Sequence, residues 1–248
     1  GLMKSGSKTL TLAASNSYDG VTTVNNGLLS VTHGNALGST NGNTVVNCSS
    51  GGYVQLSGGI TVAEPLRLNL ERPVNNSSLY NLSGSNTWSG PITRQGQNRI
   101  HGAASSVLVI TGGMTGGGGL LVLNSPGTIT FYEKPLNIGV DTFYVESLGL
   151  TVIGVAGNTW SRTRLFGSNS TLRYDAVDAQ PANASLEFGS VQVHATYNFN
   201  VNLNGFDQTV SKLVNITPST GAQIITSPTP AILTVNQDVN TLFDGRLT

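Results

Sequence analysis

The sequence is poor in charge, in cysteine and in aromatic residues. Asp, Glu, Lys and Arg make up 10% of its 248 residues, against roughly 25% in an average soluble domain, and the formal net charge is zero. Because no run of Lys or Arg occurs, nothing in the chain favours binding to nucleic acid or to an anionic membrane. Cys48 is the one cysteine, so the chain has neither an internal disulfide nor a cysteine-based zinc motif. We expect no cofactor, no metal site and no nucleic-acid partner.

Helical patterns and long apolar runs are missing as well. No window carries a sustained i, i+3, i+4, i+7 apolar stripe, because glycine or asparagine interrupts every candidate. No apolar run approaches the ~18 residues of a membrane-spanning helix. We therefore expect an all-β chain with no substantial α-helix and no membrane-spanning segment. No signal peptide is visible and the first residue is Gly1, from which we expect a mature or excised piece of a longer protein.

The abundant residues belong in short strands and tight turns. Glycine contributes 31 residues, and serine, threonine and asparagine are each almost as frequent. Leu2–Val31 shows the pattern, because alternating residues at Thr9–Leu12 and Val21–Val24 are separated by polar, glycine-bearing turns. The same pattern predicts further strands at Thr44–Cys48, Tyr53–Ser57, Ile60–Ala63, Leu66–Leu70, Ser78–Leu82, Ser106–Thr111, Leu120–Leu123, Thr128–Tyr132, Phe143–Glu146, Leu150–Val155, Thr171–Tyr174, Ser185–Phe188, Val191–His194, Tyr197–Leu203, Thr209–Ile216, Gln223–Thr226 and Ala231–Val235.

The spacing of these strands favours the coils of a solenoid over antiparallel hairpins. Strands recur about every 7–10 residues with very short turns, whereas a sandwich spaces them about 8–12 residues apart. With about 20–25 residues per coil, the chain would make roughly eleven coils of a parallel β-helix. Such a rod would be on the order of 50 Å long, with Leu, Val and Ile inside and Thr, Ser and Asn outside.

Internal similarity predicts one continuous β-helix over residues 1–248, with two similar halves at approximately 1–120 and 121–248. Lys4–Leu12 aligns with Asn124–Phe131, and Gly20–Val31 aligns with Gly139–Val152 when two inserted residues are allowed. Both alignments have an offset of about 120 residues, which is typical of a repeat protein.

Three stretches carry a resemblance to a known family. They read KSGSKTLTL…NSYDGVTTVNNGLLSV, NTWSGPITRQG…GLLVLNSPGTITF and VNLNGFDQTVSKLVN…AILTVNQDVNTLFDGRLT. They resemble the autotransporter-associated β-strand repeat, which occurs in passenger domains of type V secreted bacterial surface proteins. The resemblance implies a right-handed parallel β-helix exposed outside the cell.

The two ends of the chain look like consecutive pieces of one repeat. Asn240–Thr248 resembles Asn86–Thr93, a stretch that in the interior precedes another copy of the motif. An open β-helix end is a row of unpaired strand edges that needs a cap or a neighbour, and no capping helix is apparent. We therefore expect copies or adjacent repeats to stack end to end, with the Gly1 side against the Thr248 side.

Few residues are candidates for catalysis. Asp175 and Asp178 could divide acid and base roles, as paired carboxylates do in glycosidases, but no third acid or partner base follows at a related position. His33, His101 and His194 are single histidines far apart in sequence, and we expect them on the surface. We assign no catalytic, cofactor-binding or metal-binding residue.

The remaining motifs also have structural explanations. Gly112–Gly119 lacks the Lys-Ser/Thr of a phosphate-binding loop, so we expect a flexible corner, and Cys48 is expected to be buried. Trp88, Trp160 and the tyrosines could stack on sugars, although aromatic residues are only 6% and do not cluster in the sequence. Asn-x-Ser/Thr sequons, which stacked asparagine ladders would also explain, occur at Asn47, Asn75, Asn76, Asn81, Asn169, Asn183 and Asn215, with Asn75 and Asn76 the best acceptors.

These observations favour a non-enzymatic structural segment of an extracellular or cell-surface bacterial fibre or filament. The first alternative is an adhesin module that binds a glycan or a host protein on one face. The second is a β-helical enzyme that degrades polysaccharide. An enzyme predicts carboxylates gathered in one cleft, a binding module predicts an aromatic or charged patch on one face, and a structural rod predicts neither.

Overall fold

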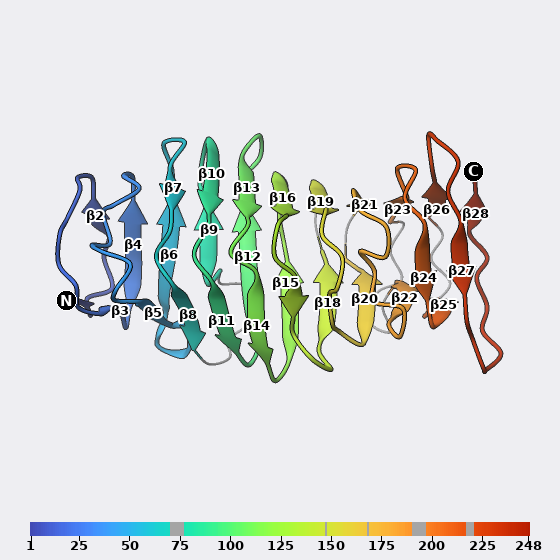
Figure 1. Cartoon of the computed structure of the whole chain (residues 1–248), viewed down its shortest axis with the longest axis horizontal. Helices are drawn as coiled ribbons and strands as arrows, with labels where there is room; N and C mark the ends of the chain where they lie inside the picture. The colour runs from blue at the N-terminus through green and yellow to red at the C-terminus, as the bar shows by residue number, and fades with distance from the viewer. Residues whose placement is uncertain (70–76, 147, 168, 190–196, 217–220) are drawn as a thin grey trace.

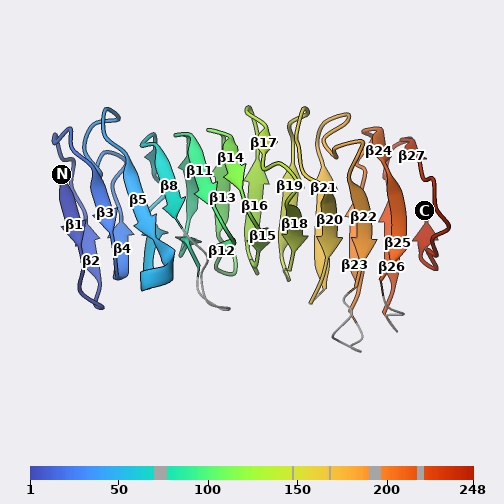
Figure 2. The same cartoon turned by 90° about the horizontal axis from the view of Figure 1, so that it is seen from below.

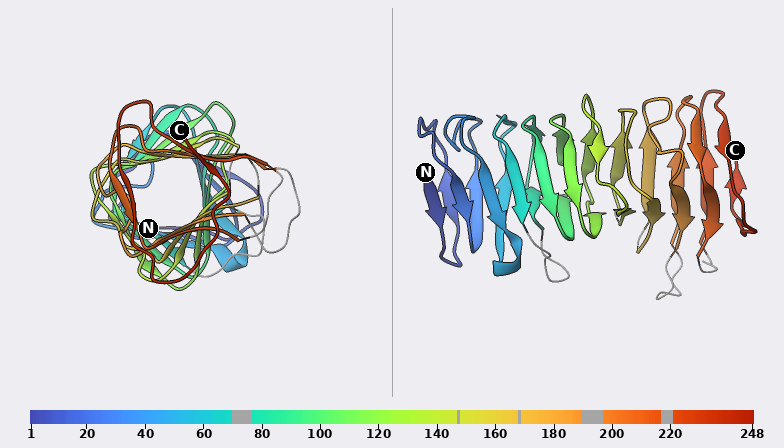
Figure 3. Two further views of the ribbon diagram at one scale, coloured as in Figure 1. Left: turned by 90° about the vertical axis from the view of Figure 1, so that its right-hand side faces the viewer. Right: turned by 60° about the horizontal axis from the view of Figure 1, so that its bottom comes forward.

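The computed structural model describes residues 1–69, 77–146, 148–167, 169–189, 197–216 and 221–248. Short strands follow one another along a single axis, with the N-terminus at one end and the C-terminus at the other (Figures 1 and 2). Seen along this axis, the coils superimpose as a tube (Figure 3). Neighbouring strands in each sheet of the described residues come from successive coils and are parallel. The predicted all-β parallel β-solenoid is confirmed.

A ten-stranded sheet runs the length of the rod and shows that the solenoid has about ten turns, close to the predicted eleven. Its strands are β2 (Leu10–Leu12), β4 (Gly27–Val31), β6 (Gly52–Leu56), β9 (Leu79–Asn81), β12 (Asn98–Gly102), β15 (Leu120–Leu123), β18 (Thr142–Val145), β20 (Arg162–Leu165), β22 (Ser185–Phe188) and β25 (Lys212–Asn215).

Two further sheets complete the wall of the tube. The seven-stranded sheet contains β1 (Leu2–Lys4), β3 (Thr22–Val24), β5 (Thr44–Asn47), β8 (Leu66–Asn69), β11 (Ile92–Gln95), β14 (Met114–Gly117) and β17 (Leu136–Asn137). The nine-stranded sheet contains β7 (Thr61–Val62), β10 (Ser85–Trp88), β13 (Val107–Ile110), β16 (Thr128–Phe131), β19 (Leu150–Ile153), β21 (Ser170–Tyr174), β23 (Phe199–Asn202), β26 (Gln223–Thr226) and β28 (Arg246–Leu247). A separate pair is formed by β24 (Gln208–Val210) and β27 (Leu233–Val235), and the described residues hold one short 3-10 turn at Cys48–Ser50.

The core fills the tube, because alternate residues of each strand point inward and stack on their equivalents in the next coil. Leu79, Ile100 and Leu123 form part of one such apolar column in the ten-stranded sheet, and all three are fully buried. Each buried aliphatic side chain of this size contributes about 1.5–3 kcal/mol relative to an exposed one. Phe143 stacks on Trp160 inside the tube, with ring centroids 4.8 Å apart.

Corners between sheets require glycine where successive coils approach closely. A Cβ atom added to Gly112 would lie 1.9 Å from the carbonyl oxygen of Gly90, one coil earlier. No side chain fits at that distance, so the glycines of the sequence mark the corners as predicted.

Several strand predictions were wrong in detail. Thr209–Ile216 was predicted as one strand, but β24 and β25 lie in different sheets on either side of Ser211. The strands β11, β12 and β14 were not predicted, because glycine and charged residues interrupt their apolar alternation. The predicted strand Val191–His194 lies outside the described residues.

Candidate functional site

The two candidate catalytic acids do not form a carboxylate pair with shared function. Asp175 accepts hydrogen bonds from Arg173 (2.7 Å), from the hydroxyl of Tyr132 (2.8 Å) and from the amide of Asn204 (2.9 Å). Desolvation alone would raise the pKa of Asp175, but these hydrogen bonds outweigh it and lower the pKa. Asp178 is exposed and donates its backbone N–H to the carbonyl oxygen of Asp207. Asp175 is thus a half-buried carboxylate whose ionised form is stabilised by hydrogen bonds from several coils.

The histidines do not converge. His33 is exposed and accepts a hydrogen bond on Nδ1 from the backbone of Asn35, 3.1 Å away. His101 is half-buried on the ten-stranded sheet, where desolvation lowers its pKa. His194 lies outside the described residues. Within the part of the chain that the structure describes, no three His, Cys, Asp or Glu side chains are placed to hold a metal ion.

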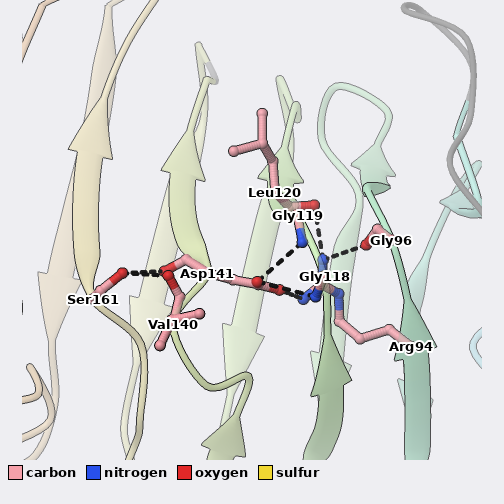
Figure 4. A network of polar contacts seen from close by, with 8 residues as sticks. All are labelled: Arg94, Gly96, Gly118, Gly119, Leu120, Val140, Asp141 and Ser161. Carbon is pink, nitrogen blue, oxygen red and sulfur yellow. Dashed lines mark hydrogen bonds and ion pairs between the residues drawn. The ribbon is translucent and has the colours of Figure 1, made fainter.

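The glycine run is more ordered than the sequence indicated. Half of Gly112–Gly119 belongs to strand β14, so the predicted flexible corner is wrong for those residues. Beyond the strand, the backbone N–H groups of Gly118 and Gly119 donate to Oδ1 of Asp141 at 3.1 and 3.0 Å (Figure 4). A side chain on Gly117 would lie 3.0 Å from the same carboxylate, which explains why glycine is needed here.

Asp141 also forms an ion pair with Arg94, and both side chains are buried in the corner between sheets (Figure 4). The guanidinium of Arg94 donates further hydrogen bonds to the carbonyl oxygens of Gly96 (2.7 Å) and Leu120 (2.9 Å). These partners lie on three successive coils, so the pair joins three layers of the rod. The side chains of Arg94 and Asp141 are almost fully buried, although Gly118 beside them is exposed.

A second buried carboxylate has no such partners. Glu64 follows β7 and points inward at the corner, with 3% of its surface exposed, and neither carboxylate oxygen has a hydrogen-bond partner. The register of β5, β8 and β11 aligns Glu64 with Gly42 in the preceding coil and with Gly90 in the following coil, and neither of these two residues has a side chain. Burial raises the pKa of Glu64 to about 7.

The other candidates are structural. Cys48 is fully buried, as predicted, with its thiol 3.7 Å from the carbonyl oxygen of Val46. Asn47, one of the sequon asparagines, donates to Asn25 (2.7 Å) and accepts from Asn69 (3.2 Å), so the predicted asparagine ladder is confirmed there. The preferred sequons, Asn75 and Asn76, lie outside the described residues.

Breaking this ladder should weaken the rod slightly. We expect Asn47→Ala to lower the free energy of unfolding by about 1 kcal/mol, because both ladder bonds are lost. Urea denaturation measures the difference, with Asn236→Ala as the control because Asn236 is exposed. Equal effects of the two substitutions would show that the ladder does not stabilise the fold.

The tryptophans are not sugar platforms. Trp88 and Trp160 are buried, and their indole N–H groups donate to the carbonyl oxygen of Glu64 (2.9 Å) and the hydroxyl of Thr163 (2.7 Å). Their proposed role on the surface is therefore wrong. The described strands of the seven-stranded sheet contain no aromatic residue, and the four aromatic residues in the described strands of the nine-stranded sheet are all buried.

Within the described strands of the three long sheets, the outward aromatic side chains lie on the ten-stranded sheet, which the sequence did not reveal. Its outer side from β6 to β22, here called the aromatic face, is made of Tyr53, Tyr80, Arg99, His101, Tyr144, Glu146, Arg162, Arg164, Phe166 and Glu187. Each ring of this set is half-buried, and those of Tyr53, Tyr80, His101 and Tyr144 are flanked along the strand by buried residues. Tyr80 contacts His101 with ring centroids 4.9 Å apart, and Tyr144 contacts Phe166 at 5.8 Å.

Most charges of the aromatic face are paired. Arg99 lies 3.4 Å from Glu146, and Arg164 donates to Glu187 at 2.7 Å while its guanidinium carbon lies 5.4 Å from the ring centre of Tyr144. These contacts hold the long side chains across the coils. Arg162, which is exposed on the same side of β20, has no ion-pair partner among the described residues, so the face carries one unpaired positive charge.

Comparison with known proteins gives one finding. A family model, the passenger-associated-transport-repeat, matches residues 2–31. Neither the curated proteins nor the solved structures gave a match. The matched segment contains the strand pairs β1–β3 and β2–β4, which is the smallest stretch in which one coil pairs with the next. This match and the parallel β-solenoid fit the autotransporter passenger repeat that the sequence motifs resemble. The described residues hold no helix long and apolar enough to cross a membrane.

Proposed function

We propose that this chain is a non-enzymatic structural segment of a passenger-type bacterial surface protein, and that it extends by stacking coils end to end. The passenger repeat at residues 2–31 and the solenoid fold support the first part and a secreted or surface location. The open ends of the rod support the second part, and they are the observation that carries it.

The C-terminal end offers an apolar surface in its last coil. A cavity of about 350 Å³ is lined there by Leu203, Ile225, Ala231, Leu233 and Leu247, and Leu247 is 65% exposed. Strands β27 and β28 are the last members of their sheets. One edge of each therefore offers backbone groups to a further coil.

The N-terminal end has matching features. Strands β1 and β2 are the first members of their sheets. Leu2, Leu10 and Leu12 pack against the core but are only partly buried. A coil added to this end would pair with the free edges and cover these side chains, so a second copy or an adjacent repeat fits both ends.

Charged substitutions at the ends test the proposal. We expect the chain to form oligomers or filaments that grow with concentration, and Leu2→Asp or Leu247→Asp to reduce them, because both side chains belong to inward columns at the open ends and a carboxylate there would be buried in the joint. Light scattering after size exclusion and electron microscopy measure this. Val140→Asp is the control, since Val140 is 88% exposed and lies between β17 and β18, away from both ends. Isolated short rods at all concentrations would contradict the stacking.

The absence of enzymatic activity is part of the proposal. Asp175, the better of the two candidate acids, has a lowered pKa and is held by Arg173, Tyr132 and Asn204, which makes it a poor proton donor. The adhesin alternative is favoured by a separate observation, the aromatic face.

A further inference from the structure

We propose that the aromatic face binds a linear, uncharged glycan that lies along the axis of the rod. This inference does not depend on end-to-end stacking. It starts from the uneven distribution of aromatic residues over the three long sheets, because every outward aromatic ring in their described strands lies on the ten-stranded sheet.

The rings are arranged in the direction of the axis. Strand register places His101 beside Tyr80 of the neighbouring coil. It also places Tyr144 beside Arg164, and Phe166 lies two residues after Arg164 in the same coil. Neighbouring coils lie about 4.8 Å apart, so the six coils from β6 to β20 extend roughly 25 Å. All of these coils except that of β15 contribute an aromatic ring. The β15 strand is followed by Asn124, whose Oδ1 accepts a hydrogen bond from Nδ1 of His101 at 3.2 Å. A ligand that contacts all the rings is therefore extended and parallel to the axis.

The width of the face favours a narrow ligand over a folded protein. Each coil contributes two or three outward positions to the face, which are about 7 Å apart. The face thus covers roughly 350 Å², whereas a stable protein interface buries about 800 Å² on each partner. A chain of sugar units has the appropriate width, because it is one ring across.

The charges select against a polyanion. Arg99 and Arg164 are each paired with a glutamate of the same face, which leaves Arg162 as its one unpaired cation among the described residues, whereas a polyanion carries charged groups along its whole length. The C–H faces of pyranose rings suit aromatic rings, and their hydroxyl groups suit the guanidinium, carboxylate and amide groups held alongside. Uncharged sugar therefore complements the face better than an acidic glycan does.

Titration of the purified chain with neutral and charged glycans tests the inference. The probes are cellohexaose, laminarihexaose, mannohexaose, maltohexaose and chitohexaose (N-acetylated), with dextran sulfate as the polyanion. We expect at least one neutral hexasaccharide to bind, and the Tyr80→Ala/Tyr144→Ala variant to bind it at least tenfold more weakly. The matched control is Tyr132→Ala, which removes an outward tyrosine that follows β16 of the nine-stranded sheet.

A second measurement needs no destabilising variant. In the chain labelled with 3-fluorotyrosine, the fluorine signals of Tyr80 and Tyr144, assigned through Tyr→Phe variants, should shift on saccharide addition while that of Tyr132 stays in place. The inference is overturned if no neutral probe binds, if dextran sulfate binds more tightly than every neutral probe, or if binding shifts Tyr132 and leaves Tyr80 and Tyr144 unchanged. None of these outcomes would affect the result of the stacking experiment, because that experiment reports on the ends of the rod.

Discussion

Replacing Asp141 with alanine should lower the free energy of unfolding by about 3–5 kcal/mol, the usual cost of removing one partner from a buried ion pair. Arg94 would remain buried without its counter-ion, and the N–H groups of Gly118 and Gly119 would lose their acceptor. Because these groups belong to three coils, the loss should loosen the middle of the rod. Urea denaturation, followed by circular dichroism, measures the change.

Removing the other partner should cost less. In Arg94→Met the carboxylate of Asp141 keeps its two backbone hydrogen bonds, so we expect a loss of about 1–3 kcal/mol. Asp238→Ala is the control, because Asp238 is exposed and should change stability by less than about 0.5 kcal/mol. If Asp141→Ala costs no more than Asp238→Ala, the pair does not hold the coils together.

The fold could be predicted because strand and corner signals are local. Alternating residues such as Thr128–Phe131 become strands wherever one face meets a core, and glycine marks corners where coils approach closely, as at Gly112. Ser211 shows the limit of these local signals. It separates β24 from β25, which belong to different sheets, although the alternation of the sequence continues through it. A corner without glycine leaves no signal in the pattern.

The candidate sites were harder to predict because they depend on register between coils. The aligned residues Val54 and Leu79 are 25 residues apart, whereas Leu79 and Ile100 are 21 apart. With coil lengths this variable, no fixed period brings Tyr80 beside His101. The buried position of Arg94 was equally hard to predict, because in β11 it occupies an inward position at which the alternating pattern predicts an apolar residue.

Glu64→Gln should stabilise the protein at pH 8 and have little effect at pH 4. The pKa of Glu64 is raised to about 7 in the folded chain, against 4.5 in its ordinary state. Below pH 4.5 the carboxyl group is protonated in both states, so it contributes no difference. Between pH 4.5 and 7 the unfolded chain releases a proton that the folded chain retains, so stability falls as pH rises through this window, and above pH 7 the loss is complete.

The size of the loss follows from the shift, at about 1.4 kcal/mol for each pH unit, which sets an upper limit of about 3.5 kcal/mol. Relaxation of the surrounding residues around the ionised carboxylate reduces this cost, so we expect about 1–2 kcal/mol. The amide of glutamine has the same shape and does not ionise. The variant should therefore exceed the wild type by this amount at pH 8.

Other groups also change the stability of the fold with pH, and the comparison of Glu64→Gln with the wild type has to separate their contributions from that of Glu64. Desolvation lowers the pKa of His101, so its contribution to stability rises with pH up to about 6.5 and opposes that of Glu64. Asp175 has a lowered pKa, so its contribution is lost only in more acidic solution. Both are present in the wild type and in the variant, and they cancel in the difference between the two unfolding curves at each pH. Glu133→Gln, a substitution at an exposed glutamate, is the control, and the burial of an ionisable Glu64 would be contradicted if Glu64→Gln behaved in the same way.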